Sequence, residues 1–288
     1  MMQQAKAEQK IKITSTRAQV KKVVYCALAI AIGALFLFPL YWLFMYSFKS
    51  NNEVLVVSAL PLYPTLDPWK DQVGNPEFLQ SLKNSIIIAC LAMSVSFLLG
   101  TTAAYGISRF RFPGKNVLIL VFLVTQMMPA SLLLTPLYLT FSNLGLLNTY
   151  IAPALAISSG SIPFIVITLR PYFMSIPREL DDAARIDGCN ALTSFLRIMI
   201  PIIKSGLVTI IVITFLHGWN DLIYSMTFNV SELMRPLTAN ISRFMNKYGT
   251  RWNAIMAYGM ILVIPVTLAF VFLQKYIVGG LTSGAVKG

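Results

Sequence analysis

Six long apolar stretches limit what this 288-residue chain can fold into. A helix needs about 20 predominantly apolar residues to cross a hydrocarbon layer of roughly 30 Å. The segments that reach or approach that length are about 23–48, 84–108, 117–141, 150–170, 203–224 and 254–278. The composition agrees, because 56% of the residues are hydrophobic and only 12% are charged. The sequence therefore predicts an all-α integral membrane protein with six transmembrane helices.

The connections between these stretches are short. None is long enough to hold a second hydrophobic core, so we expect one membrane domain over 23–288. It follows a basic, polar leader at 1–22, and it includes a loop at 171–202 and a tail at 279–288. The first apolar stretch is longer than the core of a signal peptide, and no cleavage site follows it promptly. We therefore expect it to remain as a span.

Lysine and arginine are distributed unevenly between the loops. They are frequent in the leader, in 109–116, in 170–204 and in the tail, and sparser in 49–83, 142–149 and 225–253. The positive-inside rule then predicts a multi-pass protein with both termini in the cytoplasm. The net charge of +12 comes from these scattered loops and not from one basic surface. We therefore expect membrane lipid, and no nucleic acid, as a partner.

The sequence lacks the usual signs of catalysis. His217 is the only histidine and has no acidic residue three or four positions before it, so no metal site is predicted. The 3 cysteines form no paired pattern. Lys115 follows a glycine, as in a phosphate-binding loop, but Asn116 stands where Ser or Thr would hold magnesium. We expect no catalytic residue, no bound cofactor and no ATP hydrolysis by this chain itself.

Prolines and polar residues within the spans favour a passage through the helical bundle. Proline bends a helix, and polar groups at membrane depth are costly unless they face the bundle interior or water. Gln126 lies in the third stretch, and Trp219, Asn220 and Asp221 end the fifth. Trp219 suits either an interfacial anchor or an aromatic platform beside a hydrophilic solute. These four residues are the candidate pathway or solute contacts.

An acidic segment, PRELDDAARIDGCN, lies between the fourth and fifth stretches, on the predicted cytoplasmic side. Pro177 is tolerated in a first helical turn, the acids that follow suit the positive end of the helix dipole, and Gly188 is a natural stop. A helix of two or three turns is too short to be stable alone. We expect it to dock, with Ala183 and Ala184 allowing close approach. The alternative is a solvated loop whose acids balance neighbouring basic residues.

The same segment resembles the signature loop of permease subunits of bacterial ABC importers. The matching residues are Asp182, Ala183, Ala184, Gly188, Ile198, Ile200 and Pro201. The family has Glu-Ala-Ala, a glycine and Ile-x-Leu-Pro at these places, so Asp182 stands for glutamate and Ile200 for leucine. The words LNTYIAPAL, WNDLIYSM and GAVKG extend the resemblance over nearly the whole chain. They are similar to the carbohydrate-importer branch, specifically to the smaller six-span permease of the maltose transporter.

This resemblance implies a type I ABC importer permease fold with a cytoplasmic coupling helix, in a bacterial cell membrane. The implied partners are a second homologous permease, two ATPase subunits that carry ATP and magnesium, and an extracellular or periplasmic solute-binding protein. The implied ATPase-coupling residues are Asp182, Ala183, Ala184, Asp187 and Gly188. The family tail that reaches between the ATPases corresponds here to Ser283, Gly284, Ala285, Val286, Lys287 and Gly288.

Three functions follow in order of preference. The first is import of a sugar or oligosaccharide, in which this chain couples ATP use by its partners to alternating access. The second is import of another solute, such as a polyamine, phosphate or an amino acid, by the same kind of machine. The third is an ATP-independent channel or carrier. It is disfavoured because ion-coupled carriers use acids inside their spans, and this chain has none centrally placed.

Overall fold

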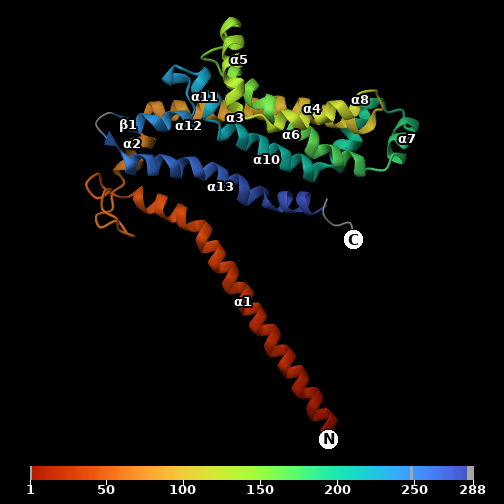
Figure 1. The fold of residues 1–288 in the computed structure, drawn as a ribbon, viewed down its shortest axis with the longest axis horizontal. Helices are drawn as coiled ribbons and strands as arrows, with labels where there is room; N and C mark the ends of the chain where they lie inside the picture. The colour runs from red at the N-terminus through yellow and green to blue at the C-terminus, as the bar shows by residue number, and fades with distance from the viewer. Residues whose placement is uncertain (1, 247–248, 284–288) are drawn as a thin grey trace. The chain divides into compact units, whose positions relative to one another are not determined.

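Helices account for nearly all of the secondary structure in the computed structural model, which describes residues 2–246 and 249–283 (Figure 1). The longer helices are α1 (Met2–Tyr46), α3 (Pro76–Arg109), α4 (Lys115–Met127), α5 (Ala130–Asn143), α6 (Ile151–Ser175), α10 (Lys204–Trp219) and α13 (Trp252–Ser283). The short ones are α2 (Asp67–Val73), α7 (Glu179–Ile186), α8 (Ala191–Ser194), α9 (Ile200–Ile202), α11 (Ile223–Phe228) and α12 (Leu237–Asn240). A π-helical turn spans Phe195–Met199, and 3₁₀ turns span Glu232–Met234 and Ile241–Phe244. Strands β1 (Met245–Asn246) and β2 (Gly249–Thr250) pair antiparallel.

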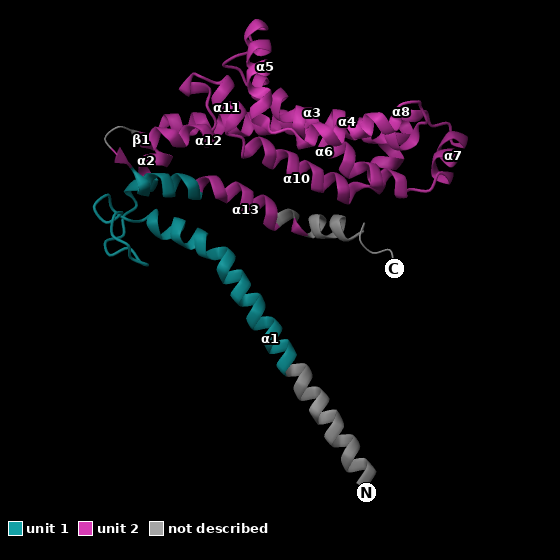
Figure 2. Ribbon diagram, viewed as in Figure 1, with its two compact units in different colours: residues 1–69, 251–260 teal, residues 70–250, 261–288 magenta. Residues whose placement is uncertain are grey.

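The chain divides into two compact units (Figure 2). Unit 1 comprises Met1–Trp69 and Arg251–Met260. Unit 2 comprises Lys70–Thr250 and Ile261–Gly288, and it contains the acidic segment and most of the predicted spans. The site described below therefore lies within unit 2.

Each of the six predicted stretches corresponds to helical structure. Among the described residues, four helices are long and apolar enough to cross a membrane: Val20–Tyr46, Pro76–Arg109, Ile151–Ser175 and Trp252–Val271. The third and fifth stretches are each a bent pair of helices instead. The pair α4 and α5 bends by 100°, and Ala191–Ile202 bends by 87° against α10. Proline explains the first bend, because Pro129 directly precedes α5 and cannot continue the hydrogen-bonding pattern of α4.

Helix α3 is the central element of unit 2, and α6 and α10 pack against it. Small residues allow this close packing. A Cβ added at Gly218 of α10 would lie 2.6 Å from the Cα of Ala89 in α3, and one added at Gly100 of α3 would lie 2.7 Å from Ile165 in α6. Such spacing has no room for a larger side chain. The three helices therefore form one tightly packed body.

Unit 1 contains a buried lysine that organises its non-helical segment. The Lys49 side chain is fully buried, and its Nζ donates to the carbonyl oxygens of Val56 at 2.9 Å and Ser58 at 3.1 Å. The same ammonium lies 3.8 Å from the centre of the Tyr46 ring, a cation–π geometry. Asn253 donates to the Lys49 carbonyl oxygen at 3.1 Å. Buried charge is tolerated here because acceptors surround it.

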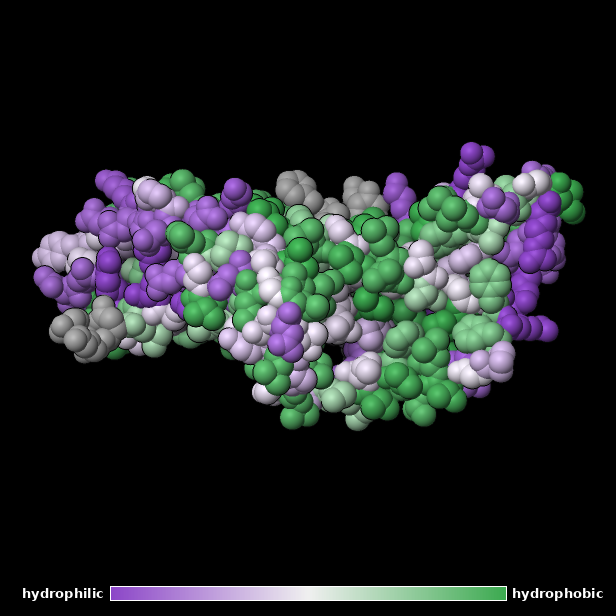
Figure 3. Space-filling view, turned by 90° about the horizontal axis from the view of Figure 1, so that it is seen from above, coloured by the Kyte–Doolittle hydropathy of each residue, from purple (hydrophilic) through white to green (hydrophobic). Residues whose placement is uncertain are grey.

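Polar side chains gather at the two ends of unit 2, one bearing α7 and the other bearing α12 and the β hairpin, with apolar side chains between them (Figure 3). At the α12 end, fully buried Asn84 of α3 donates to the carbonyl oxygens of Leu233 at 2.8 Å and Arg235 at 3.0 Å. Ser85 accepts from the Leu237 N–H at 2.8 Å. These bonds attach the segment after α11 to the beginning of α3.

Candidate functional site

The acidic segment folds as predicted into a short helix, α7. Arg178 is the residue before its first turn, which contains Glu179, Asp181 and Asp182. Acids at this end interact favourably with the helix dipole. A helix of 8 residues does not persist alone in water. Contacts with the rest of unit 2 must therefore hold it.

A complete Schellman motif ends α7 at Gly188. The Gly188 N–H donates to the Arg185 carbonyl oxygen at 3.0 Å, and the Cys189 N–H donates to the Ala184 carbonyl oxygen at 2.8 Å. Gly188 has φ +80°, the left-handed conformation that glycine adopts without steric cost. The predicted stop at Gly188 therefore corresponds to an observed reversal of the chain. Asn190 then begins α8 by accepting from the Thr193 N–H at 2.9 Å.

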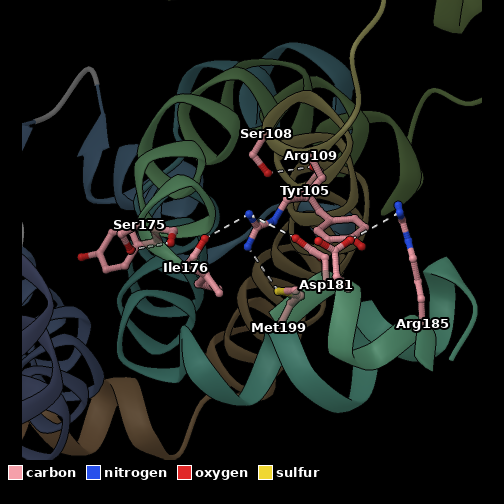
Figure 4. Close-up of polar contacts among 10 residues, drawn as sticks. Tyr105, Ser108, Arg109, Ser175, Ile176, Asp181, Arg185 and Met199 are labelled. Carbon is pink, nitrogen blue, oxygen red and sulfur yellow. Dashed lines mark hydrogen bonds and ion pairs between the residues drawn. The ribbon is translucent and has the colours of Figure 1, made fainter. Parts of the chain in front are cut away.

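Asp181 attaches α7 to the helical bundle through Arg109 at the end of α3 (Figure 4). Arg109 Nη1 lies 3.3 Å from Asp181 Oδ2, and their side chains are only 7% and 18% exposed. The same nitrogen donates to the Ile176 carbonyl oxygen at 3.1 Å, and Nη2 lies 3.6 Å from Met199 Sδ. One guanidinium thus joins α3 and α7 to Ile176, which precedes α7, and to Met199, which follows α8. We call this set of contacts the Arg109 anchor.

Neither Arg109 nor the inward role of Asp181 is predictable from local sequence patterns. Arg109 is one of several basic residues at predicted cytoplasmic span ends, where the positive-inside rule alone accounts for it. Its partner is 72 positions away in the chain, so no local spacing reveals the pair.

The two alanines of α7 lie in different environments. Ala184 is 1% exposed and packs inside unit 2, whereas Ala183 is exposed. Because Ala184 is buried against its own unit, only Ala183 presents its methyl group at the surface. Close approach by another molecule would therefore involve Ala183, while Ala184 seats α7 on the bundle.

The outward side of α7, which we call the outer face, carries Asp182, Ala183, Ile186 and Asp187. All four side chains are exposed, and Ile186 is 86% exposed. Asp182 Oδ1 lies 3.7 Å from Arg185 Nη1, with both side chains more than two-thirds exposed. Such a surface pair adds little stability, so Asp182 remains available to another charge. The outer face thus combines an exposed isoleucine with two exposed acids.

A cavity of about 360 Å³ lies beneath α7. Its walls include the Arg109 anchor, Tyr105 of α3 and Ser194 of α8. The cluster of buried aromatic residues Tyr105, Phe173 and Phe195 supports it, with ring centroids 4.9 to 6.3 Å apart. The anchor is therefore a polar contact at the edge of an apolar core and not an isolated surface pair.

The predicted pathway residues lie in three different settings. Gln126 is exposed near the end of α4, and Asn220 is exposed just after α10. Trp219 is 2% exposed, and its Nε1 donates to the Leu262 carbonyl oxygen at 3.2 Å, so its ring offers no surface to a solute here. Asp221 accepts from the Ser225 N–H at 2.8 Å and so begins α11. The four residues thus differ in exposure and in the contacts that they make.

The predicted ATPase-contacting tail lies almost entirely outside the described residues, which end at Ser283. No group of three or more His, Cys, Asp or Glu side chains with metal-binding geometry occurs in the described part of the chain. The geometry that can be assigned to function is therefore that of α7, its anchor and its outer face.

Comparisons with known proteins agree with this geometry. Residues 96–283 match the family described as binding-protein-dependent transport system inner membrane component. The diacetylchitobiose uptake system permease protein DasC of Streptomyces coelicolor is 29% identical over 91% of this chain and 95% of that protein. The trehalose transport system permease protein SugB of Mycobacterium tuberculosis is 31% identical over 88% of this chain and 93% of that protein.

A solved structure shares the fold. A chain of a bacterial ABC transporter involved in the import of the acidic polysaccharide alginate superposes with a TM-score of 0.77 at 23% identity, covering 90% of this chain and 96% of that one. This likeness confirms the predicted importer permease fold. The family match includes α7, the Arg109 anchor and both bent helix pairs, and it begins within α3 at residue 96. The chain therefore belongs to the family of inner membrane components of binding-protein-dependent transport systems.

Proposed function

We propose that this chain is a permease subunit of an ABC importer for a sugar or oligosaccharide, and that α7 is its coupling helix. The observation that carries the proposal is the two-sided packing of α7. One side is joined to α3 by the Arg109 anchor, and the other side presents the outer face. A short helix that is fixed to the bundle and exposed outward is suited to transmit displacement from a bound subunit.

The proposed partners follow from the family. Two ATPase subunits, which carry ATP and magnesium, bind at the outer face, and Asp182 pairs with a basic residue of the ATPase. A second permease completes the passage, and a solute-binding protein delivers the solute from the opposite side. The α7 end of unit 2 and both termini are then cytoplasmic, as the distribution of basic residues predicts. We further propose, from the family resemblance alone, that the tail at 283–288 contacts the ATPases.

The energy for the conformational change comes from ATP bound to the partner subunits. Shifting two states from 1:99 to 99:1 requires roughly 5.5 kcal/mol of differential binding. One exposed ion pair at Asp182 is worth about 0–1 kcal/mol and cannot supply it. In this mechanism α7 transmits force, and the closure of the ATPase pair drives the change. A solute of sugar type is favoured because relatives of this chain are named for the transport of diacetylchitobiose and trehalose.

Copurification tests the proposal. The tagged chain is purified from its native membrane with and without Asp182→Lys, and accompanying proteins are identified by mass spectrometry. Glu232→Lys is the matched control, because it reverses an exposed acid at the opposite end of unit 2. We expect the ATPase to be lost only with Asp182→Lys, while the second permease stays bound. Recovery of the same amount of ATPase with all three chains would contradict the docking role of α7.

A further inference from the structure

His217 lies on α10, the apolar second half of the bent helix pair that corresponds to the fifth predicted stretch, and yet its side chain is exposed. A polar side chain facing lipid is costly, so intramembrane polar groups face a bundle interior, a partner or water. The imidazole does not turn into the core of its own unit. The surface that it occupies must therefore face something other than lipid in the assembled transporter.

Neighbouring residues of α6 hold the imidazole in place. Ser161 Oγ lies 3.2 Å from His217 Nδ1, and the Ser161 side chain is itself only 2% exposed. The Phe164 ring lies 5.7 Å from the imidazole, tilted by 59°. With Nδ1 engaged by the serine, Nε2 is the ring nitrogen that remains for a contact outside the unit.

Gly160 makes room beside this pair. It is exposed, and a Cβ built there would meet no atom within 4 Å. Residues four apart on a helix lie on one face, so Gly160 and Phe164 border the same surface. The result is a shallow polar and aromatic patch, which we call the His217 patch: Gly160, Ser161, Phe164 and His217.

We propose that the His217 patch lines the solute passage and contacts a neutral, hydroxyl-rich solute. An aromatic ring beside a few oriented hydrogen-bonding groups is the usual composition of a small-molecule contact. The ring packs against the C–H groups of a sugar, and the imidazole exchanges hydrogen bonds with its hydroxyls. The patch contains no lysine or arginine, so it does not select an anion. This inference rests on the proposed function as an importer of sugars.

Thiol labelling tests the exposure of the patch to water without knowledge of the solute. His217→Cys is introduced into this chain after its 3 native cysteines have been replaced, and the variant is assembled into the whole transporter. It is treated with a charged, water-soluble methanethiosulfonate, with and without ATP and vanadate. Leu98→Cys is the control for an exposed apolar position of α3. We expect His217→Cys to react and Leu98→Cys to resist. If both react only with the membrane-permeant N-ethylmaleimide, in both states, the inference is overturned.

A second labelling variant guards against misassembly of the first. Gly160→Cys has open space for its side chain and does not disturb the Ser161–His217 contact. It is expected to react with the water-soluble reagent in the same state as His217→Cys. Resistance of Gly160→Cys in both states would overturn the inference even if His217→Cys cannot be purified.

Uptake by proteoliposomes containing the whole transporter tests the solute contact. Radiolabelled trehalose, maltose and diacetylchitobiose are the probes. For a probe that is transported, His217→Ala is expected to raise KM about 3- to 10-fold, the effect of losing one hydrogen bond. His217→Gln, which keeps hydrogen-bonding atoms, should restore most of it. Thr102→Val is the control, because Thr102 is an exposed hydroxyl of α3 that bonds only to its own helix.

The outcomes separate this inference from the proposed function. An unchanged KM in His217→Ala, with a probe that the unaltered transporter takes up, overturns the inference and leaves the importer function standing. Uptake of none of the three probes by the unaltered transporter counts against the sugar assignment. In that case the labelling result alone decides whether the patch lines the passage.

Discussion

Replacing Asp181 by asparagine should release α7 from the bundle, whereas the same change at Asp182 should not. The two positions carry the same chemical group in one helix. Asp181 is 18% exposed and pairs with Arg109 at 3.3 Å, whereas Asp182 is 71% exposed and 3.7 Å from its partner. The comparison therefore separates burial and anchoring from the general effect of removing an acid.

The expected magnitude follows from these environments. A hydrogen bond to a charged group contributes about 1.5–3 kcal/mol, and Asp181→Asn also leaves the Arg109 guanidinium without its counter-charge. At about 1.36 kcal/mol per factor of ten, the opening equilibrium of α7 shifts roughly 10- to 150-fold. Asp182→Asn removes an exposed pair worth about 0–1 kcal/mol. It should change the same equilibrium by only a few-fold.

Hydrogen exchange of the purified transporter measures this equilibrium directly. Amides of α7 exchange through local opening, so a peptide that covers 179–190 reports the release of the helix. We expect this peptide to lose protection in Asp181→Asn and to keep most of it in Asp182→Asn. Arg109→Met should resemble Asp181→Asn, and the double variant should cost less than the sum of the two. Equal exchange of the peptide in Asp181→Asn and Asp182→Asn would refute the anchor.

Three further changes test other features of the structure. Gly188→Ala should loosen the end of α7 by about 1–2 kcal/mol because Gly188 has a positive φ, and Gly188→Asn should loosen it by less. Hydrogen exchange of the Cys189 amide measures this effect. An equal effect of both variants would argue against a backbone cause. Gly218→Ala should cost about 1–3 kcal/mol by forcing α10 away from α3, whereas Gly106→Ala should not, because Gly106 has open space beside it. Thermal unfolding of the purified chain compares the two variants. Equal unfolding midpoints would speak against the tight contact. Asn84→Ala should cost about 1–3 kcal/mol, because the Leu233 and Arg235 carbonyl oxygens lose their buried amide donor. Faster exchange in 229–240 is the expected signature, and normal protection there would be contrary to the proposed attachment.

The sequence was sufficient for the features that depend on local patterns. Apolar length predicted six membrane-crossing segments, and α1, α3, α6 and α13 each contain one long continuous apolar helix at four of them. Helix-terminating chemistry predicted the stop at Gly188, where the φ of +80° is observed. The signature of α7 led to the family, which the profile match at 96–283 confirms.

Features that depend on distant contacts were not predictable in this way. Hydropathy does not report the direction of the helix axis, so the 100° bend between α4 and α5 could not be predicted within one apolar stretch. Trp219 was read as an anchor or a solute platform, but its Nε1 reaches the Leu262 carbonyl oxygen, 43 positions away. The Arg109–Asp181 pair likewise joins residues 72 positions apart. Such pairs are set by helix packing, which a single sequence does not encode visibly.

Helix α3 has polar attachments at both of its ends: Asn84 and Ser85 near its beginning and Arg109 at its last residue. At 1.5 Å per residue, its 34 residues form a rod about 51 Å long. Because the rod is stiff, a tilt of about 10° at the Arg109 end displaces the other end by about 9 Å. The two ends of unit 2 are thus mechanically linked by a single element, and a displacement of α7 needs no flexible loop to reach the segment after α11.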